Sequence, residues 1–234
     1  MKIFKYEELD STNKFIKSLD NLQEYDIVIA KKQTAGRGRR GNPWTTELGA
    51  GLFSFLVEEK EGISIEEYTK LPLIIGYSVL KGLKKIENLD YKFKWTNDVY
   101  VQDKKISGIL VEKMENKFVI GIGININNKM HSSVENIGIS LREITEKEYS
   151  IDEVVIEVVE EFKKNYDKFI NGKWEEILLE INKLNYLFGK RIKISGIGEI
   201  QEGIAGDILE DGRLEVYIGD IKKAFNIGEI HIAK

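Results

Sequence analysis

The chain has 234 residues, which fits one large domain or one domain with a small appendage. Hydrophobic residues make up 42% of it, enough for a sizeable core, and the formal net charge of -4 argues against a disordered tail or a basic nucleic-acid platform. The absence of cysteine excludes disulfides, a thiolate nucleophile and a cysteine metal site. The two histidines, His131 and His231, lie too far apart for a histidine-rich metal site. No signal core and no long apolar run occur, so we expect a cytoplasmic protein without membrane contact.

The first predicted elements are a short helix and two buried strands. Ser11–Leu19 indicates a helix, for which Ser11 or Thr12 is a suitable N-cap. The apolar runs Asp26–Ala30 and Gly51–Val57 are typical of buried strands. A loop rich in glycine and arginine separates the two strands.

The longest helical pattern is Glu66–Ile86, in which apolar residues recur four apart on one face. After it, Tyr91–Trp95 alternates aromatic residues with lysines, as a strand with one buried face does. Two further strands are predicted at Lys105–Lys113 and Lys117–Asn127. Two further helices are predicted at Ile151–Ile170 and Lys173–Leu184.

The composition changes at Gly189 to short β-type runs separated by glycines, with a hairpin signal at Asp211–Gly212. A β-barrel of this size is too small to rely on its own core, so we expect it to pack against the main domain. We place the boundary near Leu187, which gives domains 1–187 and 188–234. The order of elements predicts an α+β main domain with a mixed, largely antiparallel sheet flanked by helices.

The segment Gln33–Trp44 carries the densest polar pattern of the chain. Its arginines alternate with glycines at Gly36, Arg37, Gly38, Arg39, Arg40 and Gly41. Such a segment forms either a mobile surface loop or a loop that closes on an anion, since guanidinium groups pair with phosphate and carboxylate. Adjacent cations repel one another, which favours the anion-binding alternative. Trp44 is suited to the core or to a lid over a flat ligand.

Three other polar clusters allow both a structural and a functional interpretation. Asp10–Asn13 suits a helix N-cap, and a helix N-terminus also offers free N–H donors to a ligand. Lys94–Asp98 is an ordinary strand-to-turn exit or a rim that combines a cation, an amide and a carboxylate. In Lys104–Glu112, the pair Ser107–Gly108 within an apolar strand is typical of close approach by a ligand or backbone.

Taken in order and spacing, these clusters resemble the catalytic domain of biotin protein ligases, also called biotin–acetyl-CoA-carboxylase ligases. The matching motifs are D-S-T-N at Asp10–Asn13, Q-x-x-G-R-G-R-R-G and W in Gln33–Trp44, K-W-x-N-D at Lys94–Asp98, K-x-x-G-I-L-V-E at Lys105–Glu112 and G-I-G-I-N-I-N at Gly121–Asn127. The resemblance covers the whole chain. It implies a catalytic domain like that of class II aminoacyl-tRNA synthetases and a small C-terminal SH3-like β-barrel.

The resemblance implies synthesis of biotinyl-5′-AMP from biotin and ATP with Mg²⁺, and transfer of biotin to a lysine of a biotin carboxyl carrier protein. The implied catalytic residues are Lys105, Arg37 and Arg39. Biotin is expected at Ser11, Thr12, Asn13, Gln33, Arg37, Gly38, Arg39, Lys105 and Gly108. ATP and the adenylate are expected at Arg39, Arg40, Trp44, Lys94, Asn97, Asp98 and Asn125, with Mg²⁺ near Asp98 and Asn125.

The resemblance also implies a homodimer. We expect no repressor function and no nucleic-acid partner, because the D-S-T-N motif begins at Asp10 and leaves no room for an N-terminal helix-turn-helix. One departure from the family pattern is Thr96, where proline is usual. Proline would stiffen the backbone before Asn97, so threonine loosens that turn without removing a charge. A lipoate or other acyl ligase of the same fold is the principal rival, although lipoate ligases lack G-R-G-R-R-G.

Overall fold

A computed structural model describes residues 1–44, 47–195, 200–226 and 228–232. The main part of the chain contains β1 (Ile3–Leu9), α1 (Thr12–Ile16), β2 (Ile27–Gln33), β3 (Gly51–Glu58), α2 (Leu71–Ile86), β4 (Lys92–Lys94), β5 (Asp98–Val101), β6 (Lys104–Met114), β7 (Lys117–Ile124), α3 (Leu141–Thr145), α4 (Ile151–Ile170) and α5 (Trp174–Lys183). The C-terminal part contains β8 (Arg191–Ser195), β9 (Gln201–Ile208), β10 (Leu214–Ile218), β11 (Ile221–Phe225) and β12 (Glu229–Ile232). Short 3₁₀ turns lie at Arg39–Gly41 and Glu67–Lys70.

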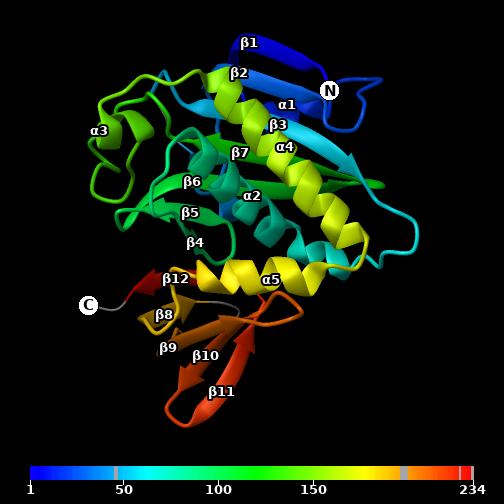
Figure 1. The fold of residues 1–234 in the computed structure, drawn as a ribbon. Coiled ribbons are helices and arrows are strands. Elements are labelled where there is room, and N and C mark those ends of the chain that lie inside the picture. The colour runs from blue at the N-terminus through cyan, green and yellow to red at the C-terminus, as the bar shows by residue number, and fades with distance from the viewer. Residues whose placement is uncertain (45–46, 196–199, 227, 233–234) are drawn as a thin grey trace.

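Strands β1 to β7 form one mixed sheet in the order β1-β2-β3-β7-β6-β5-β4 (Figure 1). Strands β1 and β2 run parallel, and the other neighbouring strands of this sheet run antiparallel. The predicted α+β class with a mixed, largely antiparallel sheet is therefore confirmed. The sequence did not indicate β1, β5 or α3.

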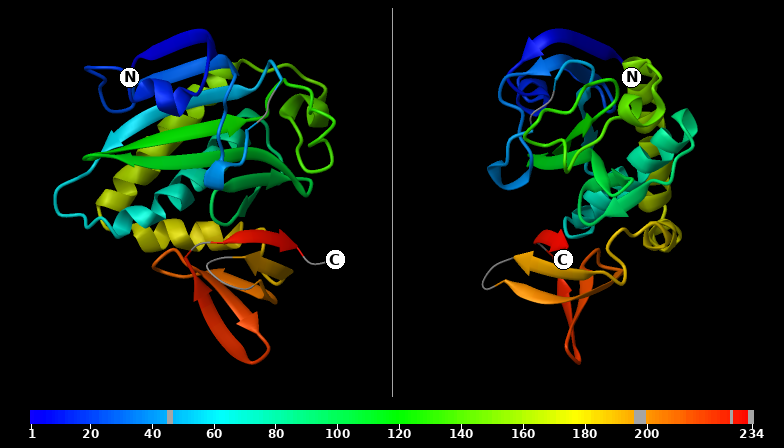
Figure 2. Two further views of the ribbon diagram at one scale, coloured as in Figure 1. Left: turned by 180° about the vertical axis from the view of Figure 1, so that it is seen from behind. Right: turned by 90° about the vertical axis from the view of Figure 1, so that its left-hand side faces the viewer.

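The two faces of the large sheet are covered unequally (Figures 1 and 2). Helices α2 and α4 lie across one face, where Phe53 and Phe55 of β3 are buried together with Phe162 of α4. On the other face the short helix α1 buries Ile16 against Val28. Helix α1 packs on β2, β3 and β7 of this face, and the segment that follows β2 brings Trp44 against Gly108 of β6 and Gly123 of β7.

Two helices differ from their predicted bounds. Glu66–Ile86 divides into the 3₁₀ turn Glu67–Lys70 and α2, because Pro72 lies in the first turn of α2, where its missing N–H costs nothing. Helix α1 is shorter than the predicted Ser11–Leu19. Ser11 does occupy its N-cap position, but the Ser11 side chain makes no capping hydrogen bond.

Strands β8 to β12 form a second antiparallel sheet in the order β11-β10-β9-β8-β12, as an SH3-like domain does. Helix α5 lies along the junction between the two sheets (Figure 1). The indole N–H groups of Trp95 and Trp174 donate to the carbonyl oxygens of Gly212 and Glu210, at 2.9 and 2.6 Å. The small sheet thus packs against the main part, as predicted. Within the described ranges, no helix is both long enough and apolar enough to span a membrane.

Candidate active site

A cavity of about 610 Å³ opens beside α1, on the same face of the large sheet. The N-terminal end of α1 and the loop after β2 form two of its sides, β6 and β7 form its floor, and β12 of the C-terminal sheet lies at its far end. Every residue predicted to bind biotin lines this cavity. Every residue predicted to bind the adenylate also lines it, with the exception of Asn125. Residues that are far apart in the sequence are therefore brought to one place.

Glycines make the floor of the cavity flat enough for an aromatic ring. A Cβ atom at Gly108 would lie 2.7 Å from Trp44 Cζ3, and one at Gly123 would lie 2.4 Å from Trp44 Nε1. The ring of Trp44 therefore rests directly on β6 and β7, with Lys105 Nζ 5.1 Å from the ring centroid. Trp44 Nε1 is buried and has no hydrogen-bond partner within the described part of the chain. Trp44 is not part of the buried core, and its role as a lid over a ligand stays a prediction.

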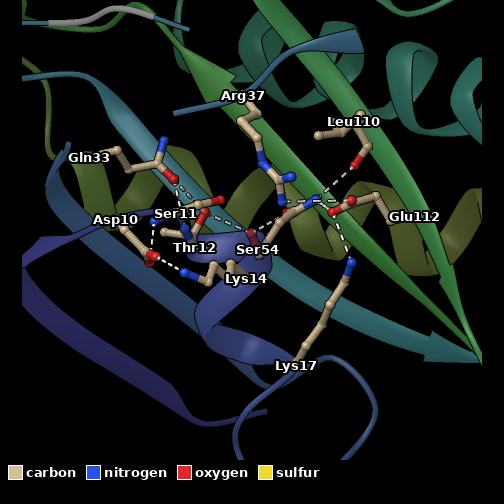
Figure 3. Close-up of polar contacts among 11 residues, drawn as sticks. Asp10, Ser11, Thr12, Lys14, Lys17, Gln33, Arg37, Ser54, Leu110 and Glu112 are labelled. Atoms are coloured by element: carbon tan, nitrogen blue, oxygen red, sulfur yellow. Dashed lines mark hydrogen bonds and ion pairs between the residues drawn. The ribbon is translucent and has the colours of Figure 1, made fainter. Parts of the chain in front are cut away.

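The side chain of Gln33 at the end of β2 is tied to the start of α1 (Figure 3). Gln33 Oε1 accepts hydrogen bonds from Thr12 N at 2.7 Å and from Thr12 Oγ1 at 3.1 Å. Ser54 Oγ of β3 donates to Thr12 Oγ1 at 2.7 Å or to Asn13 Oδ1 at 2.6 Å. The result is a set of neutral polar groups along the cavity, of which Thr12, Asn13 and Ser54 are buried.

The side chain of Asn13 is almost fully buried, with 3% of its surface exposed. Its Nδ2 donates to Glu112 Oε2 at 2.8 Å, and its Oδ1 faces Ser54. Gly121 of β7 leaves room for this amide, since a Cβ atom there would lie 2.1 Å from Asn13 Oδ1. Protein groups thus occupy both ends of the Asn13 amide.

The three arginines of the loop have different surroundings. Arg39 Nη1 donates to Asn97 Oδ1 at 2.8 Å and also to Thr96 Oγ1. Burial lowers the pKa of the Arg39 guanidinium, and the nearby Asp98 carboxylate partly opposes that change. Arg37 is half exposed, and Arg40 extends toward the C-terminal sheet, where its Nη1 donates to Ser195 O at 3.4 Å.

The turn between β4 and β5 adds a second group of charges. Asp98 Oδ1 lies 2.8 Å from Lys105 Nζ in an ion pair. Lys94 Nζ donates to the Tyr100 hydroxyl at 3.1 Å. Burial lowers the pKa of the Lys94 ammonium group, and the Asp98 carboxylate partly opposes that change. Two lysines and one carboxylate therefore face the cavity from the β4–β5 turn and the start of β6.

Asn125 is the one predicted site residue that the structure does not bring to the lining of the cavity. It is buried behind Lys105, where its Nδ2 donates to Lys105 O at 3.4 Å and its Oδ1 accepts from Asn128 Nδ2 at 3.2 Å. No group of three or more histidine, aspartate or glutamate side chains suited to a metal ion occurs among the described residues. Asp98 still suits Mg²⁺, which in nucleotide sites binds one or two carboxylates together with substrate phosphates.

Several residues of the site were not assigned from the sequence. Ser54 carried a signal, because it is a single hydroxyl in the otherwise apolar strand β3 and is fully buried. Glu112 and Gly121 lie inside recognised motifs, but no role was attached to them. Glu229 and His231 of β12 line the cavity through the packing of the C-terminal sheet, which no local pattern encodes.

The family model of the biotin/lipoate A/B protein ligase family matches residues 6–127. These residues include α1, the arginine loop and the glycine floor of the cavity. The chain belongs to the biotin/lipoate A/B protein ligase family. The resemblance drawn from the sequence motifs is therefore confirmed.

Curated members of the ligase family resemble most of the chain. The bifunctional ligase/repressor BirA of Bacillus subtilis is 28% identical over 93% of this chain and 72% of its own length. The biotin–acetyl-CoA-carboxylase ligase of Mycobacterium tuberculosis is 24% identical over 87% of this chain and 77% of its own length.

A solved structure of the ligase family matches the fold over its full length. The biotin protein ligase from Aquifex aeolicus, in complex with biotin and ATP, aligns with a TM-score of 0.90 and 31% identity. The alignment covers 100% of this chain and 99% of the Aquifex chain. The C-terminal sheet is therefore part of the shared architecture.

Proposed function

We propose that this chain is an ATP-dependent biotin protein ligase, which converts biotin and ATP into biotinyl-5′-AMP and transfers biotin to a lysine of a biotin carboxyl carrier protein. The observation that carries the proposal is the division of one cavity into two chemically different ends. Neutral hydrogen-bonding groups around Gln33 and Thr12 form one end, as a ureido ring requires. Cations from Arg39, Lys94 and Lys105 form the other end, as a carboxylate and a triphosphate require.

In the first step a carboxylate oxygen of biotin attacks the α-phosphorus of ATP, and the bond to the departing pyrophosphate breaks. Both reactants are anions, so their approach is opposed electrostatically. Lys105 and Arg39 reduce that repulsion and stabilise the charge that grows on the α-phosphate. No general base is needed, because a carboxylic acid is already ionised near neutral pH. Catalysis then depends on positioning and charge stabilisation.

In the second step the neutral amine of the carrier lysine attacks the acyl carbon of the mixed anhydride, and AMP leaves. A closed arginine loop with Trp44 over the floor protects the anhydride from water before the carrier arrives. Asp98 is our candidate ligand for the Mg²⁺ that accompanies ATP. The proposal includes a cytoplasmic location and a homodimer, which follow from the sequence and from the family resemblance.

The decisive experiment is ATP–pyrophosphate exchange with purified protein and a panel of acids. We expect biotin to support exchange and lipoate or octanoate to support little or none. Exchange with lipoate and none with biotin would overturn the choice of substrate while retaining the ligase chemistry. A gel-shift with biotin-loaded protein tests the expectation that no nucleic acid binds.

A further inference from the structure

One carboxylate connects three segments around the cavity without lining it. Glu112, near the end of β6, accepts a hydrogen bond from Asn13 Nδ2 at 2.8 Å. Lys17 Nζ, just after α1, lies 3.1 Å from Glu112 Oε2, and Arg37 Nη2 of the loop lies 3.9 Å from Glu112 Oε1 (Figure 3). Glu112 is thus the shared partner of the helix and of the loop.

The surroundings of Glu112 keep it charged. Its side chain is 25% exposed. Burial raises the pKa of Glu112, but the hydrogen bonds from Asn13 and Lys17 outweigh burial, so the pKa lies below its usual range. At neutral pH Glu112 is therefore an acceptor only, without a proton to donate.

An acceptor at this position determines which way the Asn13 amide faces. The Nδ2 end must point to Glu112, so Oδ1 must point toward Ser54 and the floor at Gly121. Ser54 in turn lies within hydrogen-bonding distance of Thr12. Asn13 Nδ2 also donates to Leu110 O, at the longer distance of 3.5 Å, so the neutral end of the cavity depends on an amide orientation for which Glu112 is the nearer acceptor.

The same carboxylate provides a partner for the loop. Arg37 lines the cavity and is 51% exposed, so its guanidinium is free to exchange Glu112 for a ligand anion at little cost. Lys17 remains beside Glu112 and balances its charge when Arg37 leaves.

We propose that Glu112 is a positioning residue for biotin: it orients Asn13 at the closed end of the cavity and holds Arg37 beside it. This inference rests on the proposed biotin ligase function. Glu112 acts through Asn13 and Arg37 and does not contact the reacting atoms. Its loss should therefore weaken the binding of biotin and leave the binding of ATP nearly unchanged.

The test measures KM for biotin, KM for ATP and kcat in pyrophosphate exchange for Glu112→Ala and Glu112→Gln. Glu59→Gln is the matched control, since Glu59 is 30% exposed and pairs with Lys113, the neighbour of Glu112 in β6, and neither Glu59 nor Lys113 lines the cavity. We expect Glu112→Ala to raise KM for biotin by more than about tenfold, with KM for ATP changed by less than about twofold. The KM for biotin of Glu112→Gln should lie between those of the wild type and Glu112→Ala. The glutamine oxygen still accepts a hydrogen bond from Asn13, but the charge that faces Arg37 is gone.

A KM for biotin at the wild-type value in Glu112→Ala overturns the inference, and so does an equal rise in both KM values. If Glu112→Ala fails to fold, Glu112→Gln decides: a rise in KM for biotin of about threefold supports the inference, and a wild-type value overturns it. The exchange assay with the wild-type protein distinguishes a failure of this inference from a failure of the proposed function. If another acid replaces biotin in the wild-type exchange assay, the function is revised and the variants are scored on that acid.

Discussion

Lys105 is held between a carboxylate and an aromatic ring of the cavity. Its ammonium group lies 2.8 Å from Asp98 and above the Trp44 ring, so it is already placed where the anionic substrates meet. We predict that Lys105→Ala lowers biotin-dependent pyrophosphate exchange by more than about tenfold, because the growing charge on the α-phosphate loses its partner. Lys104→Ala is the control, since Lys104 is bound to Glu135 O at 2.9 Å. Near wild-type exchange in Lys105→Ala would remove Lys105 from the mechanism.

At the scale of residues, most of the candidate site could be predicted because its members are contiguous in short polar motifs. Ser54 and Glu112 could not be given a role from the sequence, because each is a single polar residue whose partners lie far away in the chain. Ser54 meets Asn13 across 41 positions, and Glu112 meets Asn13 across 99. Asn125 was assigned to the nucleotide from its motif, although its side chain faces Lys105 O and Asn128 behind the cavity.

The glycine floor is a property of strands β6 and β7 rather than of one residue. We predict that Gly123→Ala displaces the Trp44 ring, since the added Cβ would lie 2.4 Å from Trp44 Nε1. Biotin-dependent exchange should fall by more than about tenfold, while the urea midpoint shifts little because the ring is at the surface of the cavity. Unchanged exchange together with unchanged tryptophan fluorescence would show that the Trp44 ring does not pack against Gly123.

The arginine loop is a second element with its own prediction. It forms a narrow hairpin in which Gly38 N donates to Asn42 O at 2.7 Å and Trp44 N donates to Gly36 O at 2.9 Å. We predict that trypsin cleaves after Arg37 and Arg39 in the free protein and that biotin with ATP protects both bonds, because ligand anions hold the guanidinium groups. Cleavage at the exposed Arg213 in the C-terminal hairpin is the control. Equal cleavage of the loop with and without ligands would contradict closure.

The elements that could be predicted are those with a long or simple hydrophobic period. Helix α4 was predicted with its observed bounds because its amphipathic pattern is uninterrupted. Strand β1 was missed because three of its seven residues are charged and it lies at the edge of the sheet. Strand β5 was missed because it is short and begins inside a turn motif at Asp98.

At the scale of the molecule, the cavity belongs to both parts of the chain. Residues of β12 and of the β4–β5 turn both line the cavity. The small sheet is therefore part of the site. Our proposed boundary near Leu187 falls between α5 and β8, where the chain passes from one sheet to the other (Figure 2). Composition alone indicated this change of architecture. The contribution of β12 to the cavity could not be predicted, because it arises from the packing of two sheets and local sequence patterns do not encode such packing.

The junction includes a pair of hydrogen bonds that one substitution can remove. Asn182 of α5 donates from Nδ2 to Ile208 O at 2.9 Å and accepts from Ile208 N at 2.9 Å. We predict that Asn182→Ala lowers the free energy of unfolding by about 1–3 kcal/mol, because both backbone groups of Ile208 lose their partner. Asn171→Ala is the matched control, since the exposed Asn171 amide donates to Asp167 O within the end of α4. Urea unfolding followed by tryptophan fluorescence measures both variants. An equal, small effect in the two would mean that this junction contributes little, and a separate early transition in Asn182→Ala would show that the C-terminal sheet detaches first.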